Sequence, residues 1–157
     1  MSSPSSPEEL DGWLRGYGWS PERNIGEEAE ELVRSAVEVF ARYGVPTSPS
    51  SCALSVVRNY GKLEFFLHDR PENHAVMVPG IVYKGQAEEV AEFEQELGAK
   101  VFAVGHDTYD GALFLVDDSN RVFLLHHSGD YFLGTGMREA FFTFMYGEFQ
   151  DAEDFHA

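Results

Sequence analysis

The sequence has very little cysteine and no long apolar run. Cys52 is the single cysteine among 157 residues, so an intramolecular disulfide and a thiolate zinc site are both excluded. No stretch approaches the roughly 20 apolar residues that a membrane-spanning helix needs. Residues 1–7 are rich in serine and proline and lack the basic and apolar regions of a signal peptide. We therefore expect a cytoplasmic protein without a membrane partner.

Positive charge is also scarce. The chain has 11 Lys and Arg against 27 Asp and Glu, which gives a formal net charge of −16. Affinity for DNA and RNA comes mostly from basic side chains that displace counterions, so we expect no nucleic-acid partner. The sequence has no Gly-x-Ser-x-Gly elbow, phosphate-binding loop or dinucleotide fingerprint. These absences predict a protein that is not an enzyme and uses no cofactor.

The residues that are present suffice for one folded domain. Hydrophobic residues make up 43% of the chain and aromatic residues 14%, which is enough for a core in a chain of this length. Apolar residues at three- and four-residue steps predict helices. The predicted helices are a short one that begins after Ser6, residues 27–43, a brief one from Ser51 to Tyr60, residues 86–97, and a last one opened by Gly136. The adjacent β-branched residues Val56 and Val57 keep a strand open as the alternative for the third of these.

Short apolar segments between turn-forming residues predict the strands. They are residues 63–67, one or two extended pieces within 74–83, residues 101–104, 112–116 and 121–125, and a further edge at 131–133. The short turns between the later segments predict an antiparallel sheet. Helices separate from such a sheet predict a single α+β domain over residues 1–157. Residues 1–6 are expected to be flexible, and residues 148–157 to form an acidic tail that is frayed from Asp151 onward.

Histidine and aspartate come together at two places that invite comparison with metal sites. His126 and His127 lie close to Asp130, but adjacent residues of a strand point to opposite faces, so only one of the two histidines is expected at any one site. The segment 105–111 holds His106, Asp107 and Asp110 and is typical of a turn whose aspartates bind backbone amides. The sequence therefore predicts no metal site.

The order of several short motifs resembles the immunity proteins of the SUKH superfamily, specifically its third immunity family. The motifs are Gly18-Trp19-x-Pro21-x-Arg23, a long helix ending in Gly44, Tyr60-Gly61-Lys62-Leu63, Glu96-Leu97-Gly98, Val104-Gly105, Asp110-Gly111, the segment from Gly129 to Gly136, and Tyr146-Gly147. The resemblance runs from about Leu10 to Gly147. Family members often have Gly-Gly-Leu where this chain has Gly61-Lys62-Leu63, and a proline where it has Ala103.

The resemblance implies a SUKH-like fold and an intracellular protein that binds and blocks a bacterial polymorphic toxin. In that superfamily the toxins are often nucleases or nucleic-acid deaminases. Enzymes that act on nucleic acid commonly present a basic groove, so an acidic inhibitor suits such a partner. The expected toxin-binding residues are the helix carboxylates Glu88, Glu89 and Glu92 and the turn carboxylates Asp107, Asp110, Asp117 and Asp118. We expect a monomer that binds a basic toxin domain.

Two other functions stay open at this point. One is a small metal-binding protein or enzyme that uses His106, Asp110, His126 or His127. The other is a scaffold or regulatory binding module, since the SUKH fold also occurs outside toxin systems.

Overall fold

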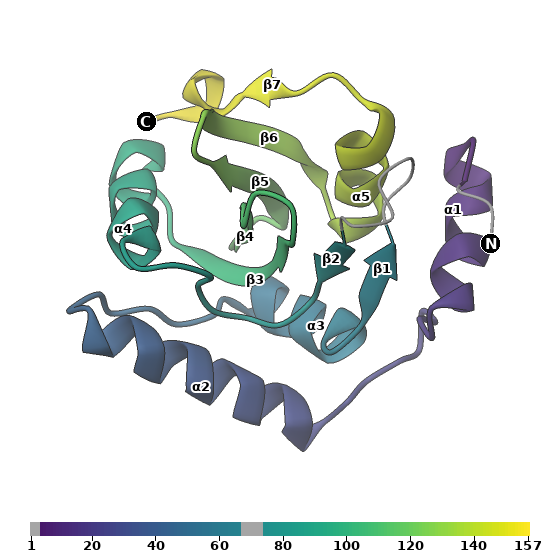
Figure 1. The fold of residues 1–157 in the computed structure, drawn as a ribbon, viewed down its shortest axis with the longest axis horizontal. Coiled ribbons are helices and arrows are strands. Elements are labelled where there is room, and N and C mark those ends of the chain that lie inside the picture. Colours follow the sequence, from purple (N-terminus) through teal and green to yellow (C-terminus); the bar gives the residue numbers. More distant parts are fainter. Residues whose placement is uncertain (1–3, 67–73) are drawn as a thin grey trace.

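The protein is an α+β domain built on one antiparallel sheet (Figure 1). The computed structural model describes residues 4–66 and 74–157. Its strands pair in the order of the sequence, from β1 to β7. This arrangement confirms the predicted fold class. The helices are α1 Pro7–Gly16, α2 Glu27–Arg42, α3 Ser51–Tyr60, α4 Gln86–Leu97 and α5 Met137–Tyr146, and the strands are β1 Glu64–Phe66, β2 His74–Val76, β3 Val101–Asp107, β4 Leu113–Asp117, β5 Arg121–His126, β6 Gly129–Thr135 and β7 Gln150–Asp151.

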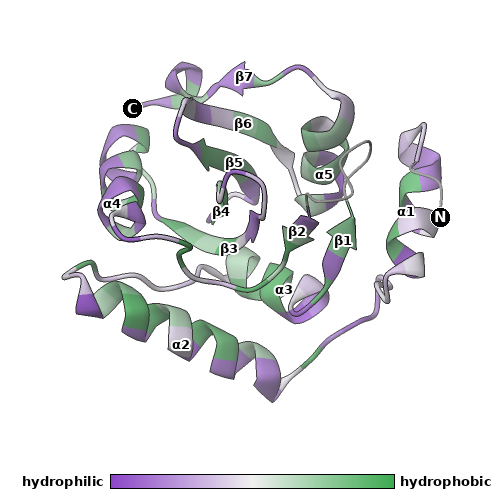
Figure 2. Cartoon of the chain, viewed as in Figure 1, coloured by the Kyte–Doolittle hydropathy of each residue, from purple (hydrophilic) through white to green (hydrophobic). Residues whose placement is uncertain are grey.

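The central strands are buried on both faces. In β4, Phe114 and Val116 join one apolar cluster, and Leu113 and Leu115 join the other. Residues of α1, α3 and α5 belong to the first cluster, and residues of α4 belong to the second. Figure 2 shows the same pattern, with apolar central strands and a polar outer face on α4. Because both faces are covered, these strands read as continuous apolar runs rather than as an alternation.

The helix starts follow the capping residues. The Ser6 hydroxyl accepts a hydrogen bond from the Glu9 amide at 3.3 Å, and Pro7 occupies the first position of α1. In α3 the cap is Ser50 and not Ser51, because the Ser50 hydroxyl accepts the Ala53 amide at 3.1 Å. Residues 51–60 form the predicted helix, and the alternative of a strand is excluded.

The Trp19 and Arg23 side chains fasten the loop after α1 to the end of α3. The Trp19 indole N–H donates to Asn59 Oδ1 at 2.8 Å. The two Arg23 nitrogens Nη1 and Nη2 donate to the carbonyls of Asn59 and Gly61 at 2.9 and 2.8 Å. A helix C-terminus leaves carbonyls without partners inside the helix, and a cation placed there satisfies them. This part of the Gly-Trp-x-Pro-x-Arg motif therefore shapes the fold.

Several boundaries differ from those the sequence suggests. Strand β6 lies between β5 and β7 and is not an edge. The prediction of a frayed tail is wrong, since Gln150 and Asp151 pair with β6, Ala152 is fully buried, and the Phe155 ring lies 4.4 Å from that of Phe132. Because acidic residues alternate with these apolar ones, the sequence reads as solvated. Two parts of the predictions lie outside the described residues: Leu67, which ends the first predicted strand, and residues 1–3 of the start predicted to be flexible. Within that start, Pro4 is buried.

Lys62 sits in an unusual backbone conformation, with φ of +70°. A left-handed conformation brings the Cβ of any residue but glycine close to its own carbonyl. The Lys62 ammonium forms an ion pair of 2.8 Å with Glu28, which offsets part of the cost of this backbone conformation. Both side chains are more than half exposed, so the pair adds little to stability.

We expect Lys62→Gly to raise the free energy of unfolding by about 1 kcal/mol, because glycine removes the left-handed penalty. Urea denaturation measures the change. Asn120→Gly is the matched control. Asn120 has φ of +65°, but asparagine tolerates that conformation, so this substitution should gain less stability than Lys62→Gly. A loss of stability in Lys62→Gly would show that the ion pair outweighs the backbone penalty.

Candidate functional site

An acidic groove lies between α4 and the turn that joins β5 to β6. It has a volume of about 300 Å³, and its acidic lining residues are Glu89, Glu92, Glu96 and Asp130. His126 and His127 form part of the same wall. A neighbouring pocket shares Glu96 and Asp130 and adds Asp151 and Glu153. Carboxylates from α4, β6 and the C-terminal segment therefore converge on one surface.

The amphipathic pattern of α4 puts its glutamates into this groove. Val90, Phe93 and Leu97 are buried against the sheet, and Glu89, Glu92 and Glu96 recur at helical spacing on the open side. The helix is held to the neighbouring loop by a buried side chain. Gln86 donates from Nε2 to the Gly111 carbonyl at 2.7 Å, and its Oε1 accepts the Val82 amide at 2.6 Å. The acidic face of α4 and the 107–111 loop thus keep a set geometry.

The charges in the groove act on one another. Burial, together with the negative charges of Glu96, Glu89 and Asp151, raises the pKa of Asp130 to about 6, and His156 opposes the shift. At neutral pH this carboxylate is charged, and its charge lowers the free energy of unfolding.

The groove carboxylates have no lysine or arginine partner from this chain in the ranges 4–66 and 74–157. The ion pairs of lysine and arginine in those ranges are Arg58–Glu30, Lys62–Glu28, Arg121–Asp117 and Arg138–Asp11. His156 Nε2 approaches Glu96 at 3.9 Å. Most of the negative charge of the groove is therefore left for solvent or for a binding partner.

Exposed apolar side chains border the groove near Asp110. Val82, Tyr83 and Tyr109 are exposed to 46%, 38% and 57%. The Tyr83 hydroxyl lies 3.4 Å from Glu89 Oε2. Val82 and Tyr83 also lie next to Gly111, so close that a Cβ added there would contact both side chains. Exposed tyrosine beside charge is typical of protein interfaces.

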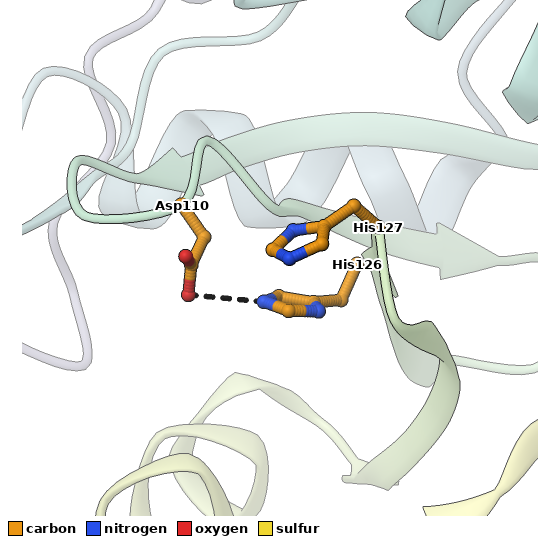
Figure 3. Close-up of side chains that lie close together, drawn as sticks. All are labelled: Asp110, His126 and His127. Atoms are coloured by element: carbon orange, nitrogen blue, oxygen red, sulfur yellow. Dashed lines mark ion pairs between the residues drawn. The ribbon is translucent and has the colours of Figure 1, made fainter.

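Asp110 meets the two groove histidines, His126 and His127, in one cluster (Figure 3). One ligand atom from each lies within 4.8 Å of the others. His126 Nε2 is 2.9 Å from Asp110 Oδ2, and the two imidazole rings are 4.0 Å apart. The prediction that the two histidines separate is wrong. Strand β5 ends at His126, and His127 begins the turn, so the alternation of a strand does not reach it. His106 lies outside this cluster, half-buried in β3, where burial lowers its pKa.

The structure overturns two of the residues expected to contact a toxin. Asp107 and Asp117 are buried, with 2% and 0% of their surface exposed, so neither carboxylate faces a partner. Asp107 accepts the Asp110 amide at 2.7 Å, and burial raises the pKa of its carboxyl. Asp117 accepts the amides of Ser119 and Arg121 at 3.0 and 2.8 Å and the Arg121 Nε–H at 2.6 Å. Each is the last residue of its strand, and its side chain binds amides of the turn that follows.

The other five expected residues are exposed, but they do not form one patch. Glu89 and Glu92 line the groove, and Asp110 adjoins it through His126. Asp118 lies beyond the opposite end of β4, and Glu88 does not line the groove. Sequence reasoning missed Glu96, Asp130 and Asp151 as site residues. The four-residue step from Glu92 points to Glu96, whereas Asp130 and Asp151 come together only through the pairing of β6 with β7.

We expect Asp117→Ala to lower the free energy of unfolding by about 2–4 kcal/mol, because it removes a buried acceptor and leaves its donors unpaired. Chemical denaturation measures the loss. Asp118→Ala changes the adjacent, exposed carboxylate and is expected to shift stability by less than about 0.5 kcal/mol. Equal effects of the two substitutions would contradict the structural role of Asp117.

We expect Asp130→Asn to stabilise the protein at neutral pH. The raised pKa means that the folded state holds the proton more tightly than the unfolded state, so the ionised carboxylate destabilises the fold increasingly between about pH 4 and 6 and fully above pH 6. Because the residue is partly exposed, the gain at pH 7.5 should be about 1 kcal/mol, and it should vanish near pH 4. Denaturation at both values tests this. Asp118→Asn, outside the groove, should show no such difference.

Comparison with known proteins places the chain. None of the helices within 4–66 and 74–157 has the length and apolar character to cross a membrane. No curated protein and no solved structure matches the chain. A family model described as SUKH-3 immunity protein matches residues 6–147, from the capping serine of α1 to the residue that ends α5. The match agrees with the motif order in the sequence, and the chain belongs to the SUKH-3 immunity protein family.

Proposed function

We propose that the protein is a stoichiometric inhibitor that binds a basic toxin domain through the acidic groove and its apolar border. Family membership supports an immunity role. The observation that carries the choice of surface is the convergence of Glu89, Glu92, Glu96 and Asp130 around one hollow with no lysine or arginine partner in the described part of the chain.

The negative charge of this surface is expected to speed association with basic partners and to disfavour acidic ones. With a net charge of −16, the protein steers basic partners toward itself, and a cluster of carboxylates concentrates that field at the groove. Screening over about 8 Å at physiological salt confines the effect to nearby groups. Basic side chains of a toxin that enter the groove would take the place of the missing lysine and arginine partners.

Affinity needs desolvated contacts as well, since exposed ion pairs add little. Tyr83, Val82 and Tyr109 supply apolar area beside Glu89 and Asp110. Tyrosines of this kind are common among the residues that dominate interface energies. The proposed contact surface therefore combines a charged groove with an apolar border.

The proposed target is a nuclease or a nucleic-acid deaminase. Such enzymes bind the phosphate backbone with basic residues, and the carboxylates of the groove can occupy positions that phosphates would take. The protein would act without turnover, as a monomer in a one-to-one complex, in the cytoplasm that it protects. Glu88 and Asp118 lie off the groove and are left out of the proposed contact surface.

The first step is to find a neighbouring gene that encodes a small basic toxin domain, and the experiment uses that domain. We expect the triple substitution Glu89→Gln, Glu92→Gln, Glu96→Gln to slow association about tenfold at low salt, because it removes the local field, and to weaken its salt dependence. Stopped-flow mixing measures the rate, and growth on co-expression of the two genes reports protection.

The matched control is Glu27→Gln, Glu31→Gln, Glu38→Gln, which makes the same charge change on exposed positions of α2. We expect it to keep the wild-type rate within about twofold, because those charges lie outside the contact surface. If both triple variants slow association equally, net charge alone matters and the groove is not the contact. If neither does, the electrostatic part of the proposal is wrong.

A further inference from the structure

We propose that Asp110, His126 and His127 form a binding site for one divalent transition-metal ion of the Zn²⁺ class. The three side chains come from the β3–β4 loop and from the end of β5 with its turn. Two imidazoles and a carboxylate are a donor set that suits zinc and its neighbours in the first transition row. The site adjoins the proposed toxin-binding groove, but its geometry points to a metal whether or not a toxin binds there.

The donor atoms are already close to the spacing that a metal requires. All three lie within 4.8 Å of one another. Zinc binds nitrogen and oxygen at about 2.0–2.2 Å, so two of its ligands stand roughly 3–4 Å apart. Asp110 and His127 are exposed, so their side chains have room to rotate toward a shared ion.

The backbone around the cluster is held in place. The Asp107 carboxylate accepts the Asp110 amide at 2.7 Å, and the Gln86 side chain binds the Gly111 carbonyl at 2.7 Å. These two buried side chains set the loop that carries Asp110. The hairpin register His126↔Gly129 sets the turn that carries His127. A metal would therefore enter a site whose supporting chain is already ordered.

His126 also has a partner for its second nitrogen. Its Nδ1 lies 2.7 Å from Ser128 Oγ and 3.0 Å from the Ser128 amide nitrogen. With Nδ1 accepting from the amide, the proton of neutral His126 stands on Nε2 and is donated to Asp110. When Nε2 binds a metal, the proton must stand on Nδ1 instead. The Ser128 hydroxyl then accepts it, and the Ser128 amide gives up its hydrogen bond to Nδ1. Metal-bound histidines generally have such an outer partner.

The surroundings favour a cation and leave room for one more ligand. Both histidines line the groove that contains Glu89 and Glu92, so the local potential attracts a positive ion. Three protein ligands leave the fourth tetrahedral position of zinc open to water or to a group from another molecule. The site thus resembles an open metal centre rather than a closed structural one.

The test is calorimetric titration of Zn²⁺ into tag-free protein that has been treated with a chelator and dialysed. We expect one equivalent to bind. Asp110→Asn and His127→Gln should each weaken binding at least tenfold, and Co²⁺ should give a visible spectrum that both substitutions abolish. Binding of less than a tenth of an equivalent to the wild type would overturn the proposal.

Two controls separate this site from other sources of metal affinity. His74→Gln removes a histidine outside the cluster, and Glu89→Gln, Glu92→Gln removes groove charge without removing a proposed ligand. Both should still bind one equivalent. If His127→Gln binds zinc as the wild type does, the site is elsewhere. Imidazole NMR of the wild type requires no variant to fold, and there Zn²⁺ should shift the His126 and His127 resonances but leave His74 unchanged.

Discussion

The strands β3, β4 and β5 bury their side chains on both faces of the sheet, and this double burial constrains the rest of the molecule. Phe114 and Val116 face one cluster and Leu113 and Leu115 face the other. Neither face tolerates water, so helices must cover both. The helices α1, α3 and α5 supply residues to the first cluster, and α4 with the C-terminal segment supplies residues to the second. Even the last residues of the chain are ordered, because Ala152 and Phe155 complete that second cover.

Burial of the strands moves the polar chemistry to their ends. Asp107 and Asp117 end β3 and β4, and both turn inward to satisfy backbone amides. Their position beside turns made them candidates for toxin contact. The same position gives them a structural role, because short carboxylates bind the amides of tight turns. Asp107 also places Asp110, which meets His126 across the next hairpin. The candidate site is thus a product of the turns that the sheet demands.

Stability and binding compete at the groove. Burial, and after it the negative charges of Glu96, Glu89 and Asp151, oppose the ionisation of Asp130 and raise its pKa. The described part of the chain offers these groups no lysine or arginine, although it pairs Lys62 with Glu28 and Arg121 with Asp117. Concentrated like charge lowers the free energy of unfolding and favours a partner of opposite charge. The electrostatics of the groove therefore favour a basic partner.

Local chemistry was sufficient to predict much of this protein from its sequence. The bounds of α4 and the start of α1 follow from apolar spacing and from Ser6 and Pro7, and the antiparallel sheet follows from its short turns. The site needed the tertiary structure. Burial of Asp107 and Asp117, the meeting of Asp130 with Glu96, and the approach of His127 to His126 depend on which strands pair and where a strand ends. Such contacts join residues that are distant in sequence or lie just past a strand end, so no local pattern records them.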